Sequence, residues 1–517
     1  MATETADAPA AILPVRSFAT GPVLGIAAAA TVLLLAFASR YGYHRDELYF
    51  LEASHHLAFG YVDQPPIAVL GAALDRVVFG NSLLGLRLIP ALLVGACIII
   101  TGAMAREFGG GRFAQGFAAL CVAGGAILAV GSLEGPTVYD VALWSLVSFL
   151  VVRILRTGDQ RLWLLVGLAV GIGVEAKQTV PLLLAGLAIG FLVNGQRAIF
   201  RSRWLWAGAA IALMGLAPNL AWQAAHGWPS AEMNSHLRAE HSGLGAAITL
   251  PFLSITAVGI AVAPIWMAGW WGLWRDSNAR RFRAFAVAFA IAFVFVWIVI
   301  PDRFYYAFGL YPVLIAYGSL ITAQVVTGER GFFRRSPQRR VLWRSPRSAA
   351  GIVVASGVVS LPLLLPVLPA STLATLNLQK VNYNLGEEIG WPEYTREVAA
   401  VWDSLAPSAR ANAVIVTSNY GEAGAIDRFG SGVGLPNAYS GHNSYWWWGP
   451  PRPTSGTAVA IGFDRSDLTP YFGTVRLAAR VHNNAGVAND EEGAPIWVCT
   501  DQVAPWPQIW PRFKDYG

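Results

Sequence analysis

The residues best suited to chemistry lie close together near the start of the chain. Four consecutive ionisable residues, His44-Arg45-Asp46-Glu47, directly follow the first long apolar run. A carboxylate in this place could take a proton from a hydroxyl group, and ionisable residues at a membrane border are functional candidates by default. A charge cluster that only marks where a helix leaves the lipid would have the same sequence, so both interpretations stand at this point.

A third carboxylate, Asp63, stands shortly before two consecutive prolines. The residue before a proline is held extended, and proline is favourable in the first turn of a helix. We therefore expect a helix from about Asp46 to Phe59, a turn, and a second helix that starts near Pro66. These helices would lie along the outer face of a membrane and carry Asp46, Glu47 and Asp63 at the mouth of a cavity.

Two cations stand at tight turns between apolar runs. Lys177 is one of only three lysines in the chain. Its ammonium group could simply extend to the membrane interface, or it could hold a phosphate as a point charge. Arg303, shortly before Tyr305, is the second phosphate candidate, and Glu134 and Asp140 flank another outer turn. Such cations would stabilise the charge that develops on a departing phosphate.

The composition indicates what must position these residues. The chain has 517 residues, of which 55% are hydrophobic and 13% charged, against ~25% charged residues in a typical soluble domain. A water-soluble enzyme and a disordered chain are therefore disfavoured. The net charge is +6, and two of the three cysteines lie inside apolar runs, so we expect no disulfide framework.

Apolar runs near the ~20 residues that span a bilayer predict about eleven transmembrane helices. We interpret the first run as a retained anchor, because it leads into further spans. The runs cover residues 20–39, 86–105, 113–133, 137–152, 162–176, 179–193, 204–222, 248–273, 284–300, 304–325 and 348–369.

The charges of the linkers predict the orientation of these spans. Arginines concentrate in alternate linkers, which the positive-inside rule places in the cytoplasm. These linkers lie within 106–112, 153–161, 197–203, 275–283 and 330–347. We therefore expect a transmembrane module of residues 1–369, with a first outer loop at about 40–85, and an extracytoplasmic domain of residues 370–517.

The tail reads as a small α/β domain. Short β-rich runs bounded by turn residues occupy 413–417, 457–463, 475–481 and 495–500, and residues 393–405 have helical spacing. Three adjacent tryptophans could dock in the membrane interface or cover a sugar ring. Polar and aromatic residues of this tail that could contact an acceptor are Asn419, Glu422, His442, Asn443 and Trp447.

The order of these motifs resembles the integral-membrane glycosyltransferases of the C-type fold. The branch it resembles contains the protein O-mannosyltransferases and the lipid A aminoarabinose transferases. The resemblance covers roughly residues 20–325, and each motif alone is weak. The matching motifs are Asp46-Glu47, Asp63-Gln64-Pro65-Pro66, the stretch from Gly80 through Arg87 to Pro90, Asp140 with Trp144, the stretch from Gly171 to Lys177, Pro218-Asn219 with Trp222-Gln223, His226-Gly227-Trp228-Pro229, and Arg303-Phe304-Tyr305-Tyr306 before Tyr311-Pro312.

This resemblance implies an inverting enzyme that takes a monosaccharide from a polyprenyl phosphate. Asp46 matches the family's catalytic carboxylate and would be the general base, and Glu47 would orient the acceptor or share that role. Lys177 and Arg303 would hold the lipid phosphate. Supporting residues would be Asp63, Glu134, Asp140 and Tyr305.

The expected partners follow from the same resemblance. They are the lipid-linked donor, a glycan, lipid or protein acceptor, and the bilayer of a bacterial plasma membrane, with no nucleic acid. No metal is obligatory, although His44, His55 and His56 leave a divalent metal open.

Two other classes of function compete with this interpretation. A transporter or flippase for a lipid-linked or polyol substrate would place carboxylates at the membrane midplane. A noncatalytic assembly or sensor protein would bind glycan with its outer domain. The sequence names neither the sugar nor the acceptor.

Overall fold

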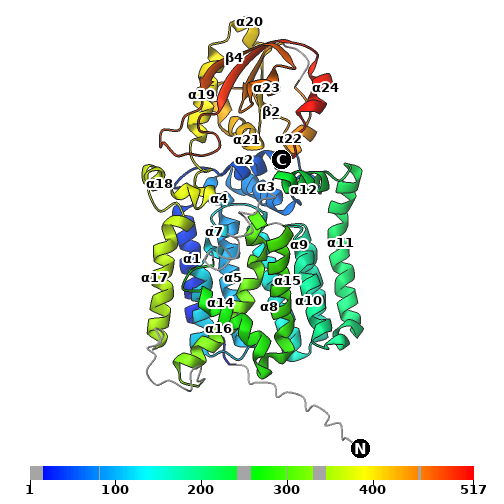
Figure 1. Ribbon diagram of the computed structural model, residues 1–517, viewed down its shortest axis with the longest axis vertical. Coiled ribbons are helices and arrows are strands. Elements are labelled where there is room, and N and C mark those ends of the chain that lie inside the picture. Colours follow the sequence, from blue (N-terminus) through cyan, green and yellow to red (C-terminus); the bar gives the residue numbers. More distant parts are fainter. Residues whose placement is uncertain (1–15, 81, 241–257, 300, 330–344, 452–455) are drawn as a thin grey trace, which may run out of the picture.

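A computed structural model of the protein describes residues 16–80, 82–240, 258–299, 301–329, 345–451 and 456–517. A helical bundle makes up most of the molecule, and a smaller domain that contains a sheet covers one end of it (Figure 1). This confirms the predicted fold class. The start of the predicted run 248–273 and the predicted cytoplasmic arginines between 330 and 344 lie outside the described residues.

The long helices of the bundle run along its length (Figure 1). Exposed apolar side chains on its outside, such as Leu213, Met214 and Val359, are expected of helix faces that contact lipid. The bundle helices are α1 (Thr20–Phe37), α5 (Leu88–Glu107), α6 (Arg112–Ala123), α7 (Ile127–Val130), α8 (Pro136–Thr157), α9 (Trp163–Val174), α10 (Val180–Val193), α11 (Arg203–Ala225), α14 (Ala263–Arg275), α15 (Arg283–Val299), α16 (Tyr311–Val326) and α17 (Pro346–Leu364).

Within the described residues, seven helices are long and apolar enough to cross a membrane. They are α1, α8, α11 and α17, together with α5, α15 and α16 counted with their adjoining turns. Three further apolar helices, at Arg112–Ala123, Gln160–Val174 and Val180–Val193, are shorter. The chain is therefore a multi-pass membrane protein, and several of the predicted spans are helices below full spanning length.

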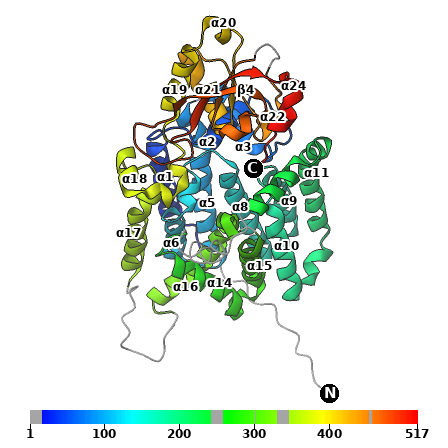
Figure 2. The ribbon, with the colours of Figure 1, turned by 45° about the horizontal axis from the view of Figure 1, so that its top comes forward.

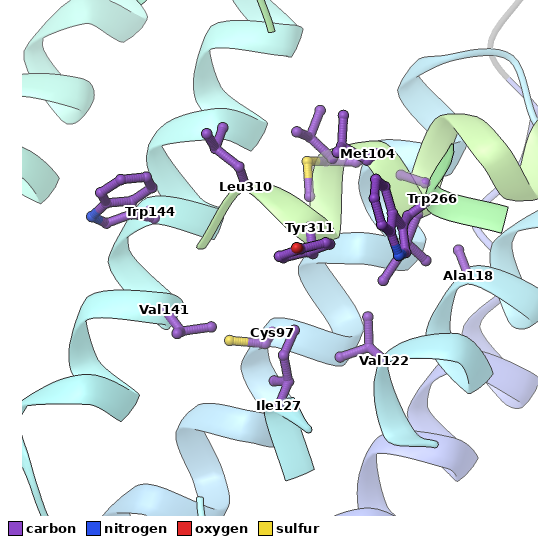
Figure 3. Packing of buried hydrophobic residues seen from close by; sticks show 14 of the residues in the cluster. Cys97, Met104, Ala118, Val122, Ile127, Val141, Trp144, Trp266, Leu310 and Tyr311 are labelled. Atoms are coloured by element: carbon purple, nitrogen blue, oxygen red, sulfur yellow. The ribbon is translucent and has the colours of Figure 1, made fainter. Parts of the chain in front are cut away.

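The centre of the bundle is filled by aromatic and small side chains (Figure 3). Trp266 meets Tyr311 edge to face, with ring centroids 5.2 Å apart. Cys97 and Cys121 are buried, free thiols, in agreement with the expectation of no disulfide framework. This packed core holds the ends of the helices, where the polar turns lie, in fixed positions.

The first outer segment (residues 40–85) contains the two predicted helices, α2 (Arg45–Ala53) and α3 (Ile67–Phe79). The short helix α4 (Leu83–Leu86) lies at its end. Helix α2 ends earlier than the predicted Phe59. The loop between the helices instead gives its carbonyl groups to α11, because Asn219 donates to the Phe59 carbonyl and Gln223 to that of Tyr61.

Residues 370–517 form the C-terminal domain, whose sheet has the order β2-β1-β3-β5-β4. Strand β1 pairs in parallel with β2 and β3, whereas β5 is antiparallel to β3 and β4. The strands are β1 (Val414–Thr417), β2 (Ala438–Ser440), β3 (Ala458–Ile461), β4 (Phe472–Arg480) and β5 (Pro495–Gln502). Four of them overlap the predicted runs, and β2 is the one that the sequence did not indicate.

Short helices surround this sheet and connect it to the bundle. Figure 2 shows α2 and α3 lying between the C-terminal domain and the membrane helices. Leu48 and Tyr49 of α2 share one buried apolar cluster with Ile426 and Tyr445 of the C-terminal domain. The outer helices are α12 (Pro229–Glu240), α18 (Ala370–Leu376), α19 (Trp391–Asp403), α20 (Pro407–Arg410), α21 (Tyr420–Phe429), α22 (Ser444–Trp447), α23 (Arg465–Leu468) and α24 (Trp506–Ile509).

Candidate active site

Asp46 lies in the first turn of α2, between the bundle and the C-terminal domain. His44 caps this helix, because its Nδ1 accepts the amide hydrogen of Asp46 at 3.2 Å. The hydroxyl of Tyr420, at the start of α21, donates to Oδ1 of Asp46 at 2.8 Å. The side chain of Asp46 remains 43% exposed, so this carboxylate is accessible for proton transfer.

Glu47 is enclosed, although it is the next residue. Its side chain is fully buried and forms an ion pair with Arg87 at 2.7 Å, and Arg87 also bonds Glu388 at 3.1 Å. The backbone amides of His44 and Glu134 donate to the two oxygens of Glu47 as well. The orientation of the acceptor by Glu47 stays a prediction, which this arrangement does not favour. The contacts suit a residue that anchors α2.

Asp63 lies in the loop between α2 and α3 and accepts a hydrogen bond from the hydroxyl of Tyr49 at 2.8 Å. Burial raises the pKa of Asp63 to about 7, and the charge of Asp46 acts in the same direction. The ring of Tyr49 packs on that of Tyr420, with centroids 4.8 Å apart. Asp46 and Asp63 are therefore held by two tyrosines that contact each other.

The predicted supporting residues Glu134 and Asp140 are both 2% exposed. Burial raises the pKa of Glu134 well above its usual value, and Tyr139 donates to its Oε2 at 3.2 Å. Asp140, in α8, accepts from the hydroxyl of Thr179 at 2.6 Å. Asp140 faces the turn that carries Lys177, whereas Glu134 lies against the ion pair of Glu47.

Lys177 and Arg303 lie on either side of Tyr306. The Lys177 ammonium group donates to Thr137 at 2.9 Å and lies over the rings of Tyr305 and Tyr306, 4.7 and 4.3 Å from their centroids. The Arg303 guanidinium, in the short helix η4 (Pro301–Leu310), donates to the Tyr306 hydroxyl at 2.8 Å. The two predicted phosphate ligands, together with Tyr305, therefore form one group.

The charge state of this group favours an anion. Burial lowers the pKa of Lys177, and the positive charge of Arg303 acts in the same direction. Tyr306 and Asp140 act against this decrease. A phosphate beside Lys177 would add negative charge and so favour the charged form of the lysine.

A backbone hydrogen bond connects the two halves of the site. The amide of Ile67, at the start of α3, donates to the carbonyl of Glu175 at 3.0 Å. Glu175 stands two residues before Lys177, and Ile67 stands four residues after Asp63. The segment that carries the carboxylates is thereby fixed to the turn that carries a cation.

Several of the predicted acceptor contacts have structural roles in the C-terminal domain. Asn419 and Glu422 form the capping box that begins α21, and the Oε2 of Glu422 accepts from Ser418 as well. The Nε1 of Trp447 donates to the Tyr516 hydroxyl at 2.6 Å. The spacing of Asn419 and Glu422 is the sequence signature of a helix start, a signal that was available before the structure.

Two other predicted acceptor residues lie beside Tyr420. His442 stacks on the ring of Tyr420, with centroids 4.7 Å apart, and its Nε2 lies 2.7 Å from the Gly517 carbonyl. Asn443 is buried and has a positive φ of 48°. These two residues shape the surroundings of Tyr420, and their contact with an acceptor stays a prediction.

Sequence reasoning missed the residues that hold the carboxylates. Tyr420 is 374 positions from Asp46 along the chain, so no local pattern pairs them. Tyr49 stands three residues after Asp46, a spacing that places both on one helix face, which was a usable signal. Arg87 was noted only within a motif, although a lone arginine directly before an apolar run indicates a buried partner.

The histidines near the site do not converge on one point. His44 caps α2, and His56 stacks on Trp448 with ring centroids 4.4 Å apart. Over the residues that the structure describes, no group of three or more His, Cys, Asp or Glu side chains is arranged to hold a metal ion. Participation of a divalent metal stays a prediction without a defined ligand set.

Comparison with a family model gives a partial match along the sequence. Residues 63–222 match the family described as Dolichyl-phosphate-mannose-protein mannosyltransferase. The matched stretch contains Asp63, Glu134, Asp140 and Lys177, and it begins after Asp46. A comparison with curated proteins gave no match.

Comparison with solved structures extends the similarity over most of the chain. The protein is similar to ArnT from Cupriavidus metallidurans in its apo state, with a TM-score of 0.59 and 16% identity. It is also similar to ArnT of the same organism bound to undecaprenyl phosphate, with a TM-score of 0.57 and 16% identity. Each comparison covers 93% of this chain and 98% of the other. The family match over part of the chain and the fold shared with these structures bear out the predicted resemblance to membrane glycosyltransferases of the C-type fold.

Proposed function

We propose that the protein moves a monosaccharide from a polyprenyl phosphate to a hydroxyl group of a cell-envelope acceptor, with inversion at the anomeric carbon. The observation that carries this proposal is the division of the site into an accessible carboxylate, Asp46, and a pair of cations, Lys177 and Arg303. The ArnT structure with bound undecaprenyl phosphate supports this class of donor.

In the proposed reaction, the carboxylate of Asp46 accepts the proton of the acceptor hydroxyl. The acceptor oxygen attacks the anomeric carbon from the side opposite the phosphate, which inverts the configuration. The bond between the anomeric carbon and the phosphate oxygen breaks, and its electron pair stays on the phosphate. Lys177 and Arg303 stabilise the charge of the departing polyprenyl phosphate.

We place this site on the outer face of the bacterial plasma membrane. The support comes from the arginine-rich linkers, two of which lie side by side because Gln196 donates to the carbonyl of Arg281. Followed along the chain in Figure 1, these linkers lie at the end of the bundle away from the C-terminal domain. By the positive-inside rule, that end is cytoplasmic and the C-terminal domain is extracytoplasmic.

The decisive experiment measures transfer from a radiolabelled sugar on a polyprenyl phosphate, with the purified full chain and envelope extracts as acceptor. We expect Asp46→Asn to lower the rate at least about a hundredfold, because general base catalysis contributes about 10²–10⁴. Asp403→Asn is the matched control, since that carboxylate is 66% exposed and pairs with Arg410. Equal rates for wild type and Asp46→Asn, or substrate transport without a covalent product, would overturn the proposal.

A panel of donors defines the sugar in the same assay. Mass spectrometry of envelope glycans from cells with and without the protein then identifies the acceptor. A mass difference of one monosaccharide on a single class of glycan, lipid or protein is the expected result.

A further inference from the structure

The hydroxyl of Tyr420, in the C-terminal domain, lies 2.8 Å from Oδ1 of Asp46. The other oxygen, Oδ2, lies 3.8 Å from Nδ1 of His44, beyond hydrogen-bond distance. One carboxylate oxygen is therefore fixed by the C-terminal domain. Because the side chain is 43% exposed, the carboxylate remains accessible while one of its oxygens is fixed.

Tyr420 is itself held by three neighbours. His442 stacks on its ring at 4.7 Å, and Tyr49 packs on it at 4.8 Å. The guanidinium of Arg45 lies 5.2 Å from the ring centroid, and Arg45 is fixed in turn by Asp490 at 2.7 Å. Contacts to the ring of Tyr420, in addition to the bond of its hydroxyl, therefore fix the position of this side chain.

Two glycines allow α21 to approach α2 closely enough for this bond. A side chain at Gly421 would come within 2.8 Å of Cβ of Arg45, and one at Gly424 within 2.8 Å of the Leu48 backbone carbonyl carbon. Atoms of real side chains do not approach so closely, so larger residues would push the two helices apart. The close packing of α21 is therefore a condition for the contact between Tyr420 and Asp46.

We propose that Tyr420 is a positioning residue for the catalytic base, so that the C-terminal domain completes the active site. This inference rests on the proposed function of Asp46. A hydrogen bond to one oxygen of a carboxylate limits the rotation of the side chain. Tyr420 therefore holds the Asp46 carboxylate in one orientation.

The charged and titratable groups around Asp46 come from several elements. His44 and Arg45 belong to the start of α2, and Asp63 to the loop before α3. Tyr420 and His442 belong to the C-terminal domain. Of these, Tyr420 is the group that donates a side-chain hydrogen bond to the Asp46 carboxylate.

Tyr420→Phe tests the proposal, because it removes the hydroxyl and keeps the ring stack. We expect kcat to fall about tenfold, the value for a lost hydrogen bond to a charged group, with KM for the donor unchanged. Tyr445→Phe is the matched control, because Tyr445 lies in the same domain and its hydroxyl donates to Asp427 instead.

A double variant separates positioning from a general loss of structure. In the Asp46→Asn background, Tyr420→Phe should cause no further loss, because Tyr420 acts through Asp46. If wild type is active, Asp46→Asn is slowed at least about a hundredfold and Tyr420→Phe matches Tyr445→Phe in both kcat and KM, the inference is wrong and the proposed function stands. If wild type transfers no sugar, the proposed function itself fails.

Discussion

Two cations near the ends of the bundle helices have opposite surroundings. Arg87 is 1% exposed, lies between the carboxylates of Glu47 and Glu388, and also donates to the backbone carbonyls of Ala38 and Gly42. Lys177 is held by the hydroxyl of Thr137 and by two aromatic rings. The first cation is neutralised within the protein, and the second retains the capacity to bind an anion.

This difference teaches how a structural charge is distinguished from a functional one. A buried charge needs partners, and a structural one finds them in the same chain. Aromatic rings stabilise a cation only weakly, so the contacts of Lys177 leave more of its charge uncompensated than those of Arg87 do. We therefore expect substitutions at Arg87 to change stability and substitutions at Lys177 to change activity.

The largest expected effect is that of Arg87→Met on stability. Removal of the guanidinium leaves two carboxylates buried without their partner, and breaking such a buried pair costs about 3–5 kcal/mol. Thermal unfolding in detergent, followed by tryptophan fluorescence, measures this loss. Arg76→Met is the control, because Arg76 bonds the hydroxyl and carbonyl of Ser54, which carry no charge. Equal stability of the two variants would break the comparison.

The next effect is that of Lys177→Met on transfer. Loss of one group that stabilises transition-state charge lowers kcat by about 10²–10³, and binding of polyprenyl phosphate should weaken as well. The midpoint of thermal unfolding should stay within a few degrees of wild type, because the contacts that the described residues give Lys177 are a hydrogen bond to Thr137 and two aromatic rings. Lys514→Met, which removes an ion pair with Glu232, should retain full transfer activity. If Lys177→Met unfolds at a clearly lower temperature than wild type but transfers sugar at the normal rate, Lys177 has a structural role and not a functional one.

The smallest effect concerns Asp63, whose pKa is raised to about 7. Between pH ~4 and ~7 the folded protein retains a proton on Asp63 that the unfolded chain has lost, so stability falls as the pH rises through this range. Asp63→Asn keeps an acceptor for the Tyr49 hydroxyl and removes this dependence. We expect it to be more stable than wild type at pH 7 and equal to it at pH 4. If the stabilities of wild type and Asp63→Asn differ by the same amount at every pH between ~4 and ~7, the raised pKa of Asp63 is wrong.

The predictable part of the fold comes from patterns within short stretches. The second helix of the first outer segment begins next to Pro66, as the rules for proline indicate, and four of the five strands overlap apolar runs between turn residues. Strand β2 has only three residues, Ala438–Ser440, which is too short for an alternating pattern. The early end of α2 depends on Asn219 and Gln223 of α11, which no local pattern reveals.

The candidate site follows the same division. The residue types at Asp46, Lys177 and Arg303 predicted their chemistry, and these roles stay predictions. The identity of their neighbours depends on tertiary contacts, as with Tyr420, and so required coordinates. Glu47 shows the limit most clearly. It is the neighbour of Asp46 in the sequence and also carries a carboxylate, but its side chain is fully buried, whereas that of Asp46 is partly exposed.

The bond between the Ile67 amide and the Glu175 carbonyl has a consequence for how this sequence can diverge. Any residue other than proline at Ile67 supplies the same amide, and any residue at Glu175 supplies the same carbonyl. The contact between the segment of Asp63 and the turn of Lys177 therefore does not depend on the side chains at Ile67 and Glu175. Lineages can exchange nearly all surrounding residues and still preserve the separation on which catalysis depends.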